Sequence, residues 1–432
     1  MAGISGPYSE RAISSALTDN RSVRIVFFEF VQHLGGARRS TVEFAERLSH
    51  HAEVCVVDPY GGCEPFTQAV LKARLNYHIL MPERKARIVG GQGQPLRRLL
   101  GLAQAMPDLY LCRRRLAEII LRLQPSLISC NNFKSAFVVG TIAALRRAPL
   151  MMHMRGWYTP DMLAPYNRWL CRRRCAALLA VSRATKAALM CSGIDAAKIH
   201  VLHNPVAVDA LLERSCRPLV NLPPHADSPV RLLVPAALMS SKGQHTAIAA
   251  LRKVLDAGID AVLWLAGPHS SPYGKDKDYP GALCSLAKEL GVAGRVAVLG
   301  QREDIPQLLA AATTVVLPTH TEGHPRALLE AFALAKPVAA TPVGGIQDMI
   351  VPGLTGLFFD VEDAEGCAAC IEALVRDPIG AKRIGRNAQE YVRLAFTPEQ
   401  QTQQALAIFR RIVSSVSIPP VAPRVESEGG EP

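Results

Sequence analysis

Short apolar runs alternate with amphipathic stretches along most of the chain. Runs such as Val23–Phe28 and Val230–Val234 contain almost no polar positions. They predict strands covered on both faces, because a strand with one solvated face would be polar at every second residue. The stretches between them have apolar residues three and four positions apart, which indicates helices. Strands that alternate with helices are typical of parallel sheets in α/β proteins.

This pattern occurs twice. The strands predicted in the first half are Val23–Phe28, Val54–Val57, Leu127–Cys130, Leu150–Met152, Ala177–Val181 and Ile199–Leu202. Those predicted in the second half are Val230–Val234, Ala261–Ala266, Val296–Leu299, Thr314–Leu317, Pro337–Ala340 and Gly356–Phe359. The expected fold is α/β, with two Rossmann-like doubly wound domains that face each other across a cleft. In such sheets ligands bind beyond the carboxyl ends of the strands.

Changes in composition mark the expected domain limits. We predict a flexible N-terminus at residues 1–20, an N-terminal Rossmann-like domain at 21–215, a proline-containing linker at 216–228, a C-terminal Rossmann-like domain at 229–397, a helix at 398–417 and a disordered tail at 418–432. The tail is rich in Pro, Glu, Ser and Gly, so it cannot bury enough apolar surface to offset chain entropy. We recognise no secretory signal and no membrane span. Eleven cysteines, most of them within apolar runs, favour a reducing, cytoplasmic compartment.

Positive charge is concentrated in the first half. Residues 1–226 contain 30 Lys and Arg against 15 Asp and Glu, whereas the remainder contains 19 against 22. Arginine clusters with apolar neighbours, such as Arg113–Arg115, fit peripheral contact with an anionic membrane surface. A basic helix face in solvent explains them equally well. We expect no nucleic-acid partner, because zinc-finger spacing is absent and aromatic residues make up only 6% of the chain.

The segment after the strand that ends at Leu317 is the most informative for chemistry. A polar loop follows the strand, Gly323 permits close backbone approach, and Pro325 suits the first turn of a helix. Glu322 in the loop and Glu330 in the helix place two carboxylates at two points along one extended ligand. Each carboxylate can accept two hydrogen bonds, as neighbouring sugar hydroxyls would provide. On the residues alone, an exposed loop acid and a helix-face acid are an equally good interpretation.

The order of motifs in this region resembles a known family. The two glutamates form an E-x7-E pattern, and Pro342–Ile346 and Gly353–Gly356 follow it. This set resembles the retaining glycosyltransferases of family 4, which have the GT-B fold. The likeness is dense from Val230 to Pro378 and fainter in the first half. It implies transfer of a hexosyl group from a UDP- or GDP-sugar to an acceptor hydroxyl with retention, in polysaccharide, lipopolysaccharide or glycolipid synthesis.

The resemblance implies roles for individual side chains. Lys242 would neutralise the departing diphosphate, Glu322 would hold the donor sugar, and His153 would be a further catalytic residue in the cleft. Glu330 would bind the ribose of the nucleotide. The residues expected to contact the donor are Gly35, Gly36, Asn204, Lys242, Glu322, Gly323, His324, Leu329, Glu330 and Gly344. A lone lysine, histidine or glycine is also a common structural residue. Each role therefore depends on all of these residues occurring together.

One position departs from the family pattern. Where the family has an arginine a few residues before the lysine, this chain has Ala237. Arg183, Arg326 or the amides of a helix start would then have to stabilise the leaving group. The resemblance implies no metal and no cofactor besides the sugar nucleotide, and a glycan or lipid-linked acceptor as the second partner. A sugar-nucleotide epimerase of the same fold and a non-catalytic GT-B-like binding protein remain as alternatives.

Overall fold

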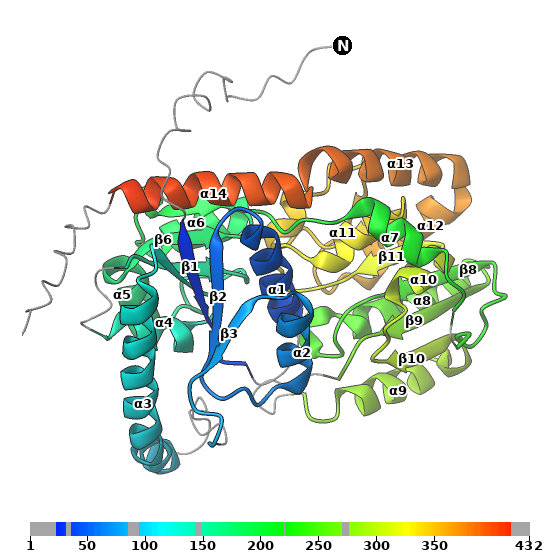
Figure 1. The fold of residues 1–432 in the computed structure, drawn as a ribbon. Helices are drawn as coiled ribbons and strands as arrows, with labels where there is room; N and C mark the ends of the chain where they lie inside the picture. The colour runs from blue at the N-terminus through cyan, green and yellow to red at the C-terminus, as the bar shows by residue number, and fades with distance from the viewer. Residues whose placement is uncertain are drawn as a thin grey trace, which may run out of the picture.

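The computed structural model describes residues 23–31, 36–84, 95–142, 148–219, 221–269 and 276–415, which form two α/β units (Figure 1). The first unit contains a parallel sheet with the strand order β3-β2-β1-β4-β5-β6-β7. Its strands are β1 (Arg24–Phe28), β2 (Glu53–Asp58), β3 (Asn76–Ile79), β4 (Leu127–Cys130), β5 (Leu150–Met154), β6 (Cys175–Ala180) and β7 (Ile199–Val201). Its helices are α1 (Gly36–Ser49), α2 (Glu64–Lys72), α3 (Pro95–Leu123), α4 (Phe133–Gly140), α5 (Pro165–Arg173), α6 (Arg183–Cys191) and the short η4 (Ala196–Lys198).

The second unit repeats this plan with the strand order β10-β9-β8-β11-β12-β13. Its strands are β8 (Val230–Val234), β9 (Ala261–Ala266), β10 (Val296–Gly300), β11 (Thr314–Leu317), β12 (Val338–Ala340) and β13 (Leu357–Phe358). Its helices are α7 (Val208–Ser215), α8 (Gln244–Asp256), α9 (Tyr279–Glu289), α10 (Ile305–Ala311), α11 (Arg326–Ala333), α12 (Ala364–Arg376) and α13 (Pro378–Ala395), with the short helices η5 (Ser240–Lys242), η7 (Ala293–Arg295) and η8 (Gly344–Asp348). In each sheet the strand order reverses beside the first strand, which is where doubly wound sheets bind ligands.

Both sheets are buried on two faces, as the continuous apolar strands require. In β1, Val26 and Phe28 pack into one core cluster, whereas Ile25 and Phe27 pack into another on the opposite face. Successive strand side chains point to opposite faces, so a strand lying between two helical layers must be apolar throughout. The predicted fold of two Rossmann-like domains is confirmed.

The chain crosses between the units twice, and the two crossings lie side by side. Helix α7 packs against α10 and α11, and its Val208 contributes to the core of the second unit. The first crossing therefore precedes α7, and the predicted linker at 216–228 lies within the second unit. The amide of Val206 donates to the carbonyl of Phe396 at the return crossing (2.8 Å). Helix α14 (Pro398–Ser415) then lies along the first unit (Figure 1), where Phe409 meets Phe44 of α1 edge to face.

Candidate active site between the two units

Two loops at the carboxyl edge of the second sheet bring Lys242 and Glu322 together. Lys242 ends η5, which follows β8, and Glu322 lies between β11 and α11. Lys242 Nζ donates to Glu322 Oε1 at 2.5 Å, and the two side chains are 20% and 18% exposed. Gly243 makes this meeting possible. It has φ +67°, and a Cβ there would lie 1.9 Å from the carbonyl oxygen of Pro318.

The loop that contains Glu322 is packed against backbone from both units. A Cβ on Gly323 would lie 2.4 Å from the carbonyl oxygen of Arg155, which belongs to the first unit. A Cβ on Gly344, where φ is +51°, would lie 1.8 Å from the carbonyl oxygen of Glu322. The amide of Gly345 donates to that same carbonyl at 3.2 Å. Gly323 and Gly344 therefore have to be glycines, because a side chain at either position would overlap with a backbone carbonyl. This close packing also fixes the point at which the Glu322 side chain leaves the loop.

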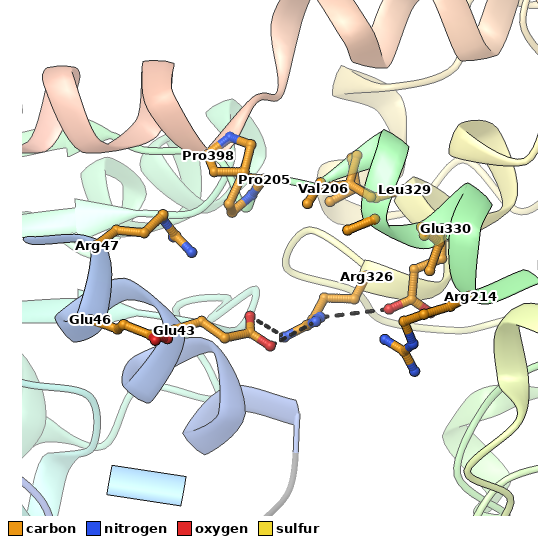
Figure 2. A pocket seen from close by; sticks show the side chains of 13 residues that line it. Glu43, Glu46, Arg47, Pro205, Val206, Arg214, Arg326, Leu329, Glu330 and Pro398 are labelled. Atoms are coloured by element: carbon orange, nitrogen blue, oxygen red, sulfur yellow. Dashed lines mark hydrogen bonds and ion pairs between the residues drawn. The ribbon is translucent and has the colours of Figure 1, made fainter. Parts of the chain in front are cut away.

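Glu330 lies in a different part of the cleft from Glu322. It lines a cavity of about 240 Å³ between the units, together with Leu329, whereas Lys242, Glu322 and His153 are not among the lining residues. Figure 2 shows the Arg326 side chain between Glu330 and Glu43 of α1. Arg326 Nη1 donates to Glu43 Oε2 at 3.0 Å, and Arg326 Nε lies 3.8 Å from Glu330 Oε1. Burial raises the pKa of Glu330 above its ordinary value, against the nearby positive charge of Arg326.

His153 is completely enclosed near the end of β5. Its ring meets Phe44 edge to face at 6.0 Å, and its Nε2 atom is shielded from solvent without a hydrogen-bond partner among the described residues. Burial, with the charge of Arg155 nearby, holds the pKa of His153 well below its usual 6.5. The imidazole is therefore neutral at physiological pH, and it could orient a hydroxyl but not supply positive charge.

The glycine loop of the first unit is described only in part. Gly36 begins α1, and a Cβ there would meet no atom within 4 Å. Gly35 lies outside the described residues.

Asn204 joins the two units at the base of the cleft. Its Nδ2 donates to the carbonyl of His324 at 2.8 Å, and its Oδ1 accepts from Arg155 Nη1 at 3.1 Å. The His324 ring itself is buried between His203 and Phe396, and burial lowers its pKa to about 3. The side chain of His324 is thus part of the hydrophobic packing at the crossing, and only its backbone is placed for ligand contact.

Arg155 is a site residue that the sequence-based prediction omits. It directly follows β5, and its Nε and Nη2 atoms are shielded from solvent without a hydrogen-bond partner among the described residues. Burial lowers the pKa of Arg155 to about 10, so the guanidinium still carries its charge. The enclosed guanidinium therefore acts on the site through Asn204, which it contacts and which joins the two units. Its position at a strand end, two residues after His153, is the sequence signal that identifies it.

Three groups are expected to replace the clamp arginine that is missing at Ala237, and the structure shows what each of them contacts. Arg326 is engaged by Glu43 and by Ser40, whose Oγ accepts from Nη1 at 3.0 Å. Arg183 is exposed, and its backbone amide donates to Asp348 across the units. Helix α11 has Pro325 at its N-cap and no side-chain cap, so the amides of its first turn are available to a ligand.

None of the described helices is both long and apolar enough to cross a membrane.

Comparison with protein families agrees with this architecture. Residues 34–210 match the family model described as Glycosyltransferase Family 4, and residues 223–391 match the one described as Glycosyl transferases group 1. The two matches correspond to the two α/β units.

Individual relatives match part of the chain. The lipopolysaccharide core biosynthesis glycosyltransferase LpsE of Rhizobium meliloti is 33% identical over 183 residues, which is 42% of this chain and 50% of that protein. A D-inositol 3-phosphate glycosyltransferase of a Nocardioides species is 31% identical over 148 residues, 32% of each chain. The chain thus spans a third to a half of the length of these curated relatives.

Solved structures show the same fold over nearly the whole chain. HepE of Anabaena in complex with UDP and glucose superposes with a TM-score of 0.74 at 21% identity, covering 90% of this chain and all of that one. The sheet topology, the two family models and this superposition agree, and the chain therefore belongs to the glycosyltransferases of the GT-B fold.

Proposed function

We propose that this protein transfers a hexosyl group from a UDP- or GDP-sugar to an acceptor hydroxyl with retention of anomeric configuration. The observation that carries the proposal is the pairing of Lys242 with Glu322 at 2.5 Å, where the carboxyl ends of β8 and β11 face the first unit. A partly exposed ammonium group and a partly exposed carboxylate are the two groups that an anionic, hydroxyl-rich donor needs.

The reaction breaks the bond between the anomeric carbon and a diphosphate oxygen, so negative charge develops on the leaving group. In the proposed complex the Lys242 ammonium turns from Glu322 to the diphosphate, and the Glu322 carboxylate accepts from sugar hydroxyls instead. The uncapped first-turn amides of α11 add positive potential where Ala237 supplies none. A leaving-group oxygen takes the acceptor proton, so no side chain has to act as a base, and no cofactor or metal is needed for this step.

Glu330 and Leu329 form the second part of the proposed donor site. The 240 Å³ cavity that they line could hold a ribose, and the enclosed Glu330 carboxylate would gain two hydroxyl donors there. Arg326 also lines this cavity, between Glu43 and Glu330, so a nucleotide bound there would have to displace part of the Arg326–Glu43 contact.

The relatives support a donor and a pathway, and both remain proposals for this chain. HepE holds UDP and glucose in its structure, which favours a UDP-sugar. The match to LpsE favours lipopolysaccharide core or a related surface glycan as the product. The acceptor would then be a glycan or a lipid-linked saccharide.

Calorimetry with UDP and GDP tests the proposal directly. We expect one nucleotide to bind to the wild-type protein, and Lys242→Ala and Glu330→Ala to abolish measurable binding. Undiminished binding in both variants would contradict the assignments. Binding of neither nucleotide would favour a non-catalytic protein, the alternative that Ala237 supports.

A second experiment separates a transferase from an epimerase. The protein is incubated with sugar nucleotide alone and then with the lipopolysaccharide-type acceptor. A transferase leaves the donor unchanged until an acceptor or water takes the sugar, and nuclear magnetic resonance then reports the anomer formed. Conversion of the sugar nucleotide to an isomer without any acceptor would overturn the proposal.

Peripheral membrane contact is a further part of the proposal, and helix α3 is the segment whose surface best supports it. Arg113 and Arg115 donate to the carbonyls of Thr141 and Leu80, so they are engaged within the protein. Exposed apolar residues on α3, such as Tyr110 (70% exposed), leave that helix as the candidate contact. Co-sedimentation with liposomes should require anionic lipid and decrease with salt, and binding indifferent to both would exclude this contact.

A further inference from the structure

Three metal-ligating side chains converge at the carboxyl edge of the second sheet, outside the donor site described above. His245 lies in the first turn of α8, His320 in the loop after β11, and Glu362 in the turn between β13 and α12. One ring nitrogen of each histidine and a carboxylate oxygen of Glu362 all lie within 4.8 Å of one another. This separation brings two neutral nitrogen ligands and one anionic oxygen ligand around a common point.

The two imidazoles are already oriented for a ligand between them. His245 Nδ1 forms a hydrogen bond with the hydroxyl of Tyr279 at 2.9 Å, which leaves Nε2 unused. The amide of His320 donates to the carbonyl of Ser241 at 2.9 Å, so the backbone behind that ring is fixed. His320 Nε2 is shielded from solvent without a hydrogen-bond partner among the described residues, and it lies 3.9 Å from Glu362 Oε1. Metal-binding histidines are commonly held as His245 is, through the ring nitrogen that faces away from the ion.

We propose that His245, His320 and Glu362 bind a divalent transition-metal ion, with Zn²⁺ as the best match. Two histidines and one carboxylate are a ligand set that zinc accepts, with a fourth position left for water, whereas Mg²⁺ and Ca²⁺ prefer oxygen ligands alone. Tetrahedral zinc holds its ligand atoms about 3.4 Å apart, so from separations within 4.8 Å the ligand atoms must close by about 1.4 Å at most. The Glu362 side chain is 68% exposed and free to make that movement.

The bound ion links the two loops that contribute Lys242 and Glu322. His320 is two residues before Glu322, and His245 is three residues after Lys242. An ion held by both histidines ties the loop after β11 to the start of α8, and through Glu362 to the turn before α12. The site holds these loops in place and takes no part in the proposed transfer, so it stands independently of the donor and acceptor.

The test uses the full chain, freed of metal with a chelator and titrated with Zn²⁺ alone against a chromophoric competitor. We expect one zinc ion per chain and no competition from Mg²⁺. Because Cys191, Cys216 and Cys284 are exposed and thiolates also bind zinc, the titration is repeated with all three replaced by Ser. The single site should persist in that background, and Co²⁺ should give the visible absorption of a tetrahedral ion without a thiolate charge-transfer band.

Variants then identify the ligands. His320→Ala and Glu362→Gln should each weaken Zn²⁺ binding at least ~10-fold, whereas His51→Ala, an exposed histidine in the first unit, should leave it unchanged. Circular dichroism without metal checks that each variant is folded. Zn²⁺ should also slow amide exchange at residues 319–323 in the wild type but not in His320→Ala. No stoichiometric zinc in the wild type, or equal binding in a His245→Ala, His320→Ala double variant, would overturn the proposal.

Discussion

The two sheet edges that meet at the cleft hold their ionisable groups in opposite ways. At the edge of the second sheet, Lys242 and Glu322 are paired but reach solvent, with 20% and 18% of their side chains exposed. At the edge of the first sheet, Glu29 and His153 are each 1% exposed, and Arg155 has two guanidinium nitrogens without solvent or a partner among the described residues. The second unit thus presents charge that a ligand can reach, and the first unit encloses charge that shapes the cleft.

This difference in exposure indicates that the two sheet edges have different roles. Partly exposed groups can exchange one partner for another with little loss of free energy, as donor binding requires of Lys242 and Glu322. Enclosed groups cannot, because each charge that forms there, and each hydrogen bond that is lost, carries a desolvation penalty. Glu29 illustrates this: its Oε1 accepts from both the backbone amide and Nδ2 of Asn131, at 3.0 and 2.6 Å, which joins the ends of β1 and β4. The side of the cleft that the first unit forms is therefore expected to be rigid.

Loss of Lys242 should have the largest effect, which is on the rate of the proposed reaction. It tests the edge of the second sheet, where the charged groups reach solvent. Lys242→Ala removes the cation proposed to stabilise the leaving diphosphate and leaves Glu322 without its partner. We expect turnover of the sugar nucleotide to fall about 10²–10³-fold, the usual result of removing one donor to a developing anion. The measurement is release of nucleoside diphosphate in a coupled assay.

A matched variant separates this role from general loss of charge. Lys253→Ala removes an exposed lysine of α8 that pairs with Glu365. Its turnover should stay within about two-fold of the wild type, since an exposed ion pair contributes little. Equal rates in the Lys242→Ala and wild-type proteins would show that the accessible charge does not serve the reaction.

The enclosed groups at the edge of the first sheet should make the stability of the protein depend on pH rather than on a bound ligand. Burial raises the pKa of Glu29 from its ordinary 4.5 to about 7. Because the folded protein holds this proton more tightly than the unfolded chain, the contribution of Glu29 to stability is full below pH 4.5 and is lost as the pH rises through 7. The loss amounts to about 3 kcal/mol. Glu29→Gln has no such proton, so the free-energy difference between wild type and variant should change by most of that amount between about pH 5 and 8.

Chemical denaturation across this pH range provides the measurement, and Glu213→Gln provides the control. Glu213 is an exposed acid on α7, and its variant should follow the wild-type profile. If Glu29→Gln also ran parallel to the wild type at every pH, the carboxylate would be ionised in the folded protein, and the contrast between the two edges would be lost.

The accessible side is easier to predict from the sequence than the enclosed one, and the reason is physical. Lys242, Glu322 and Gly344 belong to motifs whose spacing reflects one ligand, so the order of those motifs is enough to infer that they lie near one another. Most strands are also predicted correctly, because strands buried on two faces leave long apolar runs. The polar edge strand β3 (Asn76–Ile79) has no such run, and no strand is predicted there.

The enclosed groups carry no comparable signal. Glu29, Asn131 and Arg155 come from three different strand ends, and nothing in their spacing shows that they meet. The sequence predicts Glu322 and Glu330 at two points along one ligand, but it does not show that helix α1 of the first unit encloses the cavity beside Glu330. Which side of a helix faces the cleft depends on the packing of α7 and α1 against α11.

Disturbing the backbone contact where the two sheet edges meet should change the stability of the protein by an intermediate amount. A Cβ on Gly345 would lie 1.9 Å from the carbonyl oxygen of Gly323 and 2.9 Å from Cβ of Ser182 in the first unit. Gly345→Ala must therefore move the Glu322 loop, and we expect it to lower the free energy of unfolding by about 1–3 kcal/mol. Nucleotide affinity should decrease with it.

Gly294→Ala is the matched control, because a Cβ there would meet nothing within 4 Å. Its stability and nucleotide affinity should equal those of the wild type. Identical behaviour of the two variants in denaturation and calorimetry would mean that the loops of the two units are not in close contact.

The ion pair that spans the cleft should give the smallest effect. Arg326 and Glu43 are 34% and 48% exposed, and such pairs typically contribute about 0.2–1 kcal/mol. A double-mutant cycle with Arg326→Gln and Glu43→Gln should give a coupling energy in that range, decreasing with salt.

The Arg393–Asp209 pair, which joins α13 to α7 within the second unit, has a similar geometry at 2.8 Å and is the matched control. Saturating nucleotide should change the Arg326–Glu43 coupling, since both residues line the cavity beside Glu330, and should leave the Arg393–Asp209 coupling unchanged. Equal responses of the two pairs would show that the cavity beside Glu330 is not where the nucleotide binds.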